Sequence, residues 1–93
     1  MVRKYELMLV LSTEGDYESE TKRQDIVKKL IGEATIDSLT LMGKKVLAYP
    51  IQKKSEGVYL LAQLTGEPMT VGSIQKKVTQ LPEVLRYILI RKD

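Results

Sequence analysis

Cysteine and histidine, which carry much of enzyme and metal chemistry, are both missing from this sequence. Their absence excludes thiolate nucleophiles, imidazole acid–base catalysis, disulfides and the usual zinc ligands. No apolar run approaches the roughly 20 residues that cross a bilayer, and no secretion-type leader pattern opens the chain. We therefore expect a cytoplasmic protein that holds no metal and no cofactor and is not an enzyme.

Charge and length are both modest. The 93 residues suit one domain spanning 1–93, because domains commonly run to roughly 100 to 150 residues. Fifteen Lys and Arg against twelve Asp and Glu give a net charge of +3. An excess this small fits many soluble proteins, so it indicates nucleic-acid binding only if the cations gather in one place.

The first half of the chain predicts a strand, a helix and a second strand. Residues 5–11 form a short apolar run that ends at a polar turn, as a buried strand does. From about residue 18 to 31 the apolar residues recur at helical spacing, and Gly32 stands where a helix would end. The apolar, β-branched stretch 36–51 predicts a long strand with a bulge or bend at Gly43.

The second half repeats this order after a hairpin. Residues 52–57 are polar and predict the turn, and 58–65 a third strand. Apolar residues at three-and-four spacing then predict a second helix over 71–81, stopped at Pro82. Residues 84–91 are apolar and β-rich, and predict the last strand.

The order β-α-β-β-α-β predicts an α+β, ferredoxin-like sandwich. Right-handed crossovers give an antiparallel four-stranded sheet in the order 4-1-3-2, with both helices on one face. Pro50 places the second strand at an edge, because proline cannot donate to a ladder.

The sheet face turned away from the helices, called here the open face, is expected to be unusually apolar. Alternation along the strands assigns to it nine residues: Glu6, Met8, Val10, Tyr59, Leu61, Gln63, Arg86, Ile88 and Ile90. The other face receives Leu7, Leu9, Leu11, Leu60, Ala62, Leu64, Tyr87 and Leu89. An apolar open face indicates a protein partner, although scattered exposed aliphatics or a loop folded across the face would give the same pattern. One aromatic ring there is too few for a base-stacking platform.

Two groups of cations are candidates for phosphate contacts. Antiparallel pairing of the first and last strands brings together four side chains that we call the terminal rim: Arg3, Lys4, Arg91 and Lys92. Glu6 and Asp93 are expected to dilute this charge only slightly. The second group lies on the bent strand and its hairpin: Lys44, Lys45, Lys53 and Lys54. Lysines at sheet edges also prevent aggregation, which is the alternative for this group.

Three segments together resemble the bacterial small-subunit ribosomal protein six family. They are residues 3–6 (RKYE), 43–51 (GKKVLAYPI) and 83–86 (EVLR), and the resemblance covers essentially the whole chain. It implies a ferredoxin-like protein of the small ribosomal subunit that binds the central domain of the ribosomal RNA together with ribosomal protein eighteen, aiding assembly and stability. Val46 and Gln52 depart from the family's usual residues. Some members carry a long C-terminal tail, and nothing that depends on one is expected of a chain that stops at Asp93.

Carried over position by position, the family's contacts add Arg86 to the candidate RNA-binding cations. The resemblance also implies that apolar residues of the open face contact the protein partner. The candidates for RNA are Arg3, Lys4, Lys44, Lys45, Lys53, Lys54, Arg86, Arg91 and Lys92. The candidates for the protein partner are Met8, Val10, Tyr49, Tyr59, Leu61, Ile88 and Ile90.

Two other functions are compatible with the same fold. An acylphosphatase-like enzyme is disfavoured because the chain has no Asn to position a water and no Gly-rich phosphate loop. A ligand-sensing regulatory domain acting as a homodimer stays open, and a stable homodimer in solution would favour it.

Overall fold

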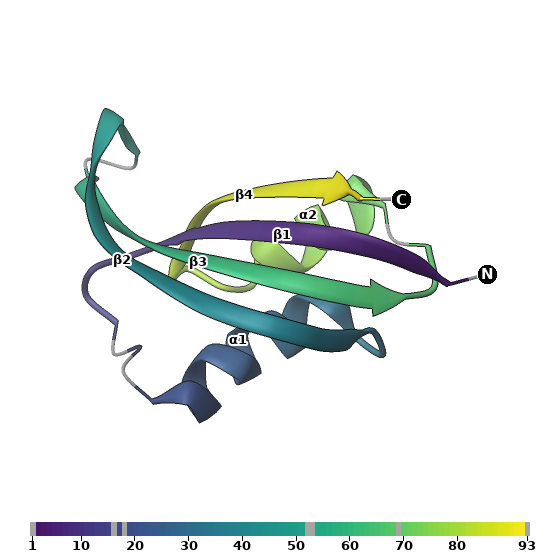
Figure 1. The fold of residues 1–93 in the computed structure, drawn as a ribbon. Helices are drawn as coiled ribbons and strands as arrows, with labels where there is room; N and C mark the ends of the chain where they lie inside the picture. The colour runs from purple at the N-terminus through teal and green to yellow at the C-terminus, as the bar shows by residue number, and fades with distance from the viewer. Residues whose placement is uncertain (1, 16, 18, 52–53, 69, 93) are drawn as a thin grey trace.

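A computed structural model gives the fold, and it describes residues 2–15, 17, 19–51, 54–68 and 70–92, with the backbone alone at 48–51 and 54. The elements follow in the expected order. They are β1 (Arg3–Leu11), α1 (Glu20–Ile31), β2 (Thr35–Ile51), β3 (Lys54–Gly66), α2 (Val71–Val78) and β4 (Val84–Arg91). The sheet is antiparallel in the order β2-β3-β1-β4, which is the predicted 4-1-3-2 read from the other edge. Both helices lie on one side of it (Figure 1).

The core forms between the helices and the strand residues that alternation assigned to that side. Leu7, Leu9 and Leu11 of β1 are fully buried, as are Leu60 and Leu64 of β3. The helices contribute their apolar stripes to the same cluster, namely Ile26, Val27, Leu30 and Ile31 of α1 and Ile74 of α2. Tyr87 and Leu89 of β4 pack against this cluster while partly exposed. The predicted inner face is therefore confirmed.

Both helices have the boundary signals that their sequences carry, but α2 is shorter than predicted. Gly32 ends α1 with a positive φ of 65°, and its N–H bonds to the carbonyl of Lys28. The Thr70 hydroxyl accepts from the Ser73 N–H at 3.1 Å and caps α2. The expected end at residue 81 is wrong, because α2 stops at Val78 and continues in tighter turns. Pro82 disfavours helical geometry in Leu81, the residue before it, which explains why the helix does not reach residue 81.

The turn predicted for residues 52–57 is also wrong. β3 begins at Lys54, and its first residues pair with the end of β2, for instance Val46 with Glu56. We call this paired extension, residues 44–51 and 54–58, the hairpin arm. It projects at the left of Figure 1, at the opposite end of the sheet from both termini. The sequence did not predict this extension because many of its residues are polar, and an exposed strand needs no alternation of apolar residues.

Gly43, the residue before the hairpin arm, bends β2. Its φ of 95° lies in the region that disfavours side chains, and the β2–β3 register shifts between Leu41 and Gly43. This confirms the predicted bulge, which increases the local twist of an edge strand. The position of β2 at the sheet edge confirms the inference from Pro50.

No helix in the described part of the chain is long and apolar enough to cross a membrane.

Candidate nucleic-acid and protein interface

The terminal rim is assembled by the β1–β4 pairing. Tyr5 lies opposite Arg91, and the Lys92 N–H donates to the Lys4 carbonyl at 2.8 Å, so the two ends of the chain run side by side. Figure 1 shows both termini at the same end of the sheet. Because side chains alternate, Lys4 and Lys92 belong to the open side, and Arg3 and Arg91 to the helix side. The rim thus wraps around the end of the sheet instead of lying on one face.

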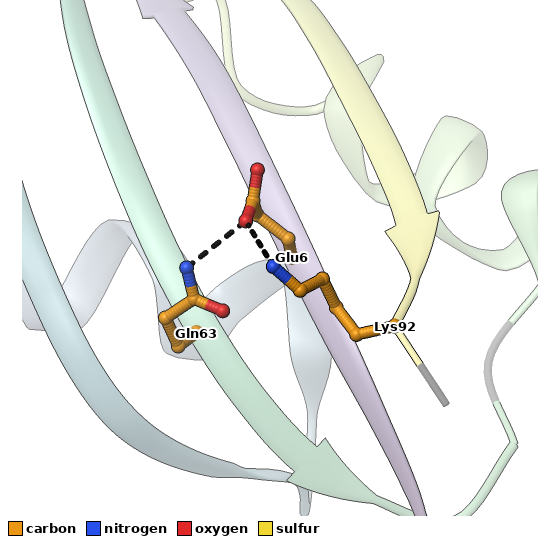
Figure 2. Close-up of polar contacts among 3 residues, drawn as sticks. All are labelled: Glu6, Gln63 and Lys92. Atoms are coloured by element: carbon orange, nitrogen blue, oxygen red, sulfur yellow. Dashed lines mark hydrogen bonds and ion pairs between the residues drawn. The ribbon is translucent and has the colours of Figure 1, made fainter.

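Lys92 of the rim is paired with a carboxylate. The Lys92 ammonium donates to Oε2 of Glu6 at 3.1 Å, and Gln63 Nε2 donates to the same oxygen at 3.0 Å (Figure 2). The expectation that Glu6 dilutes the rim only slightly needs correction, since it binds one of the rim's cations directly. The hydrogen bond from Gln63, followed by the one from Lys92, lowers the pKa of the Glu6 carboxyl below its ordinary value.

The second basic group lies on the hairpin arm, far from the rim. Lys44 and Lys45 are exposed. Lys44 lies 3.9 Å from the Glu56 carboxylate, an exposed pair of small energetic value. Lys45 Nζ lies 5.9 Å from the centre of the Tyr59 ring, within reach of a cation–π contact. Lys53 and the side chain of Lys54 lie outside the described part of the chain.

Arg86 belongs to the arm end of the sheet and not to the rim. It lies on β4 opposite Val10 of β1 and is exposed. Val10 contacts the arm, since a Cβ built on Gly57 would lie 2.5 Å from Val10 Cγ1. The structure therefore separates the candidate RNA residues into two groups at opposite ends of a molecule whose longest extent is 40 Å.

The open face is apolar along its middle and at its β4 edge, with one correction. Ile88 and Ile90 are each 49% exposed, and Met8, Tyr59 and Leu61 are half-buried. Val10 is only 7% exposed, because the hairpin arm covers it with Gly57 and the buried Leu47. The arm thus closes over one end of the open face. Val10 is not available to a partner in this conformation, and the side chain of Tyr49 lies outside the described residues.

Sequence reasoning missed Gln63 as a functional candidate, and it missed the contact between Glu6 and Lys92. Glu6 and Gln63 are direct partners in the β1–β3 register, and the residue opposite Glu6 on β4 is Ile90. The signal was present, because the two residues were assigned to the same face. What the sequence alone did not supply was the register that brings them into contact.

The described residues contain no group of three or more His, Cys, Asp or Glu side chains that could hold a metal ion.

Comparison with known proteins gives concordant results. A family model described as "Ribosomal protein S6" matches residues 4–91. Small ribosomal subunit protein bS6 of Corynebacterium kroppenstedtii is 36% identical over 96 residues, and that of Caldanaerobacter subterraneus subsp. tengcongensis is 38% identical over 94 residues, each match covering 99% of both chains. The crystal structure of 30S ribosomal protein S6 from Thermotoga maritima matches with a TM-score of 0.79 and 26% identity, covering 99% of this chain and 89% of that one.

The geometry defines a class: small ferredoxin-like proteins with an apolar open sheet face and cations at the ends of the sheet. The family match is more specific than the class, and it spans nearly the whole chain. The chain belongs to the ribosomal protein S6 family, whose members are structural proteins of the small ribosomal subunit. The chain is therefore part of a ribonucleoprotein of the translation machinery, the cytoplasmic ribosome of a bacterium, as the resemblance implied.

Proposed function

We propose that the chain binds the central domain of small-subunit ribosomal RNA jointly with ribosomal protein eighteen, and that it stabilises the assembling subunit. The terminal rim contacts phosphates, and the open face seats the protein partner. The observation that carries the proposal is the β1–β4 pairing, which gathers cations from both ends of the chain at one place.

Phosphate contacts suit the rim because its cations project around the end of the sheet. Lys4, Arg91 and Lys92 are exposed and Arg3 is half-buried. Each cation that meets a phosphate releases condensed counterions, a gain that does not depend on the base sequence. Specificity then comes from RNA shape and from the paired protein.

A protein partner suits the open face for a different reason. Its apolar side chains run across three neighbouring strands, with Leu61 on β3, Met8 on β1 and Ile88 on β4. Burying them removes apolar area from water. Tyr59 is the one described aromatic side chain on this face, and Lys45 lies over its ring, which argues against base stacking there.

The hairpin arm is a second candidate contact with RNA. Lys44 and Lys45 pair with the first part of β3, whereas Arg3 and Lys4 of the rim pair with its last residues, so the two groups would meet different phosphates. Val46 of the arm is 78% exposed, and an apolar side chain in that position contributes nothing to phosphate binding.

The rim is tested by changing Arg3, Lys4, Arg91 and Lys92 to Gln together. In complex with protein eighteen, this variant should bind a central-domain RNA fragment more weakly. The slope of log affinity against log salt should flatten by about 0.7 to 0.9 for each phosphate that the variant no longer neutralises, or about 3 if all four cations meet phosphates. Filter binding across a salt series measures both quantities.

A control with the same change in charge uses Lys28, Lys29, Lys76 and Lys77, which lie in the last turns of the two helices. Changing these four to Gln should leave the salt slope unchanged, with circular dichroism confirming that both variants fold. Equal slopes for the wild type and the rim variant would refute the rim as the RNA contact. Light scattering of the free chain should give a monomer, and a stable homodimer would favour the regulatory-domain alternative.

A further inference from the structure

A carboxylate lies within the mainly apolar open face. Glu6 of β1 has Gln63 opposite on β3 and Ile90 opposite on β4, and Met8 follows it on the same face of its strand. Figure 2 shows Gln63 of β3 and Lys92, just beyond the end of β4, converging on it from the two sides. A charged group in this position makes docking costly unless the partner bonds to it, because a partner that covers the group removes it from water.

Both contacts of the Glu6 carboxylate are made by the same oxygen, Oε2. Gln63 Nε2 and Lys92 Nζ both donate to Oε2, at 3.0 Å and 3.1 Å. No described residue donates to Oε1. The Glu6 side chain is 22% exposed and that of Lys92 is 48% exposed, so an approaching group can reach the carboxylate. The carboxyl stays ionised at neutral pH, since its pKa is below the ordinary value.

Docking of a protein makes this arrangement selective. A carboxylate buried at an interface is costly unless its lone pairs are filled, and breaking a buried charge pair leaves that cost uncompensated. Lys92 and Gln63 fill one oxygen only, so a neutral apolar partner would bury an incompletely bonded anion. A partner with an ammonium or guanidinium group opposite Glu6 completes the bonding, and a guanidinium can bond both oxygens.

We propose that Glu6 is a specificity-determining acceptor for a Lys or Arg side chain of the protein that docks on the open face. Gln63 and Lys92 are positioning residues that hold the carboxylate ready between β3 and β4. The inference rests on the proposed function, because it requires the open face to be the docking surface. It adds the chemistry of the partner: apolar contacts around one cation.

The experiment measures binding of purified protein eighteen from the same organism by titration calorimetry, at two salt concentrations, without RNA. Glu6→Gln keeps the size and shape of the side chain and removes its charge. It should weaken binding about tenfold or more and reduce the dependence on salt, since removing one member of a desolvated charge pair costs binding energy. Glu33→Gln makes the same change in charge in the exposed segment after α1 and should bind like the wild type.

Lys92→Gln distinguishes an acceptor from a structural role. This variant loses a positioning contact but keeps the acceptor, so it should weaken binding less than Glu6→Gln does, because the partner's cation still meets the carboxylate. Wild-type affinity in Glu6→Gln, or equal weakening in Glu6→Gln and Lys92→Gln that follows their loss of folding stability, would overturn the inference alone. Absence of binding by the wild-type chain would refute the docking surface itself, and the inference with it.

Discussion

At the scale of single residues, alternation along β1 decides which side chains build the core and which lie on the open face. Leu7 and Leu9 point into the core and are fully buried, whereas Glu6 and Met8 lie on the open face. A shift of one position would exchange the two sets. Glu6 is therefore as firmly placed as the leucines beside it, although it adds no apolar contact.

The Glu6 carboxylate should make stability depend on pH in the acidic range. Its folded pKa lies below the unfolded value, chiefly because of the hydrogen bond from Gln63 and then that from Lys92. The stabilisation is present above the unfolded pKa of about 4.3 and is lost as the pH falls through the folded pKa. Denaturant titrations between pH 7 and pH 3 should show a smaller acid loss for Glu6→Gln than for the wild type.

A matched variant separates this effect from general acid unfolding. Glu33→Gln removes an exposed carboxyl outside the network and should keep the full acid dependence of the wild type. Parallel stability curves for Glu6→Gln and the wild type would contradict the assignment of the pKa shift to Gln63 and Lys92.

At the scale of elements, the hairpin arm depends on close backbone approach at Gly57. A Cβ there would lie 2.5 Å from Val10 Cγ1 and 3.4 Å from Leu47 Cδ2. Gly57→Ala should therefore destabilise the protein by about 1 to 3 kcal/mol, as overpacking does, and lift the arm from the open face. Denaturant unfolding measures the loss, and faster amide exchange at Val10 would report the lifted arm.

Gly72→Ala provides a comparison of opposite sign. Its Cβ would have nothing nearer than Thr70 Oγ1 at 4.0 Å, and the residue lies in the first turn of α2. Replacing glycine by alanine in a helix should stabilise the protein by about 0.5 to 1 kcal/mol. Equal effects from the two substitutions would contradict close packing at Gly57.

Sequence patterns predicted those elements whose boundaries carry a strong local signal. β4 spans Val84–Arg91 as predicted, and Gly32 ends α1. The end of α2 was predicted three residues too late. Apolar residues at helical spacing continue to Leu81, but the chain leaves α-helical geometry after Val78. The first residues of β3 were not predicted. They are polar, and their pairing with β2 in the hairpin arm leaves no pattern in the sequence.

The candidate site was predictable to the extent that it follows from topology. The terminal rim needed only the strand order and the antiparallel pairing of β1 with β4. The burial of Val10 and the contact of Lys92 with Glu6 needed the path of the hairpin arm and the reach of individual side chains. Both features depend on packing between segments that are distant in the sequence. Alternation along one strand carries no information about that packing.

At the scale of the whole molecule, basic groups occupy both ends of the sheet and an apolar face lies between them. The rim and the hairpin arm are at opposite ends of a body 40 Å long (Figure 1). With a net charge of only +3, the proposed RNA binding depends on the placement of the cations and not on the total charge. In the proposed function, one body contacts RNA at its ends and a protein along its middle.

The most direct test is sedimentation of the labelled chain with small ribosomal subunits through sucrose gradients at low and high salt. The chain should sediment with the subunit at low salt and be released as salt rises, because phosphate contacts weaken steeply with ionic strength. The variant with Arg3, Lys4, Arg91 and Lys92 changed to Gln should be released at a lower salt concentration. Failure of the wild-type chain to sediment with the small subunit, or release that is the same at every salt concentration, would contradict the proposed function.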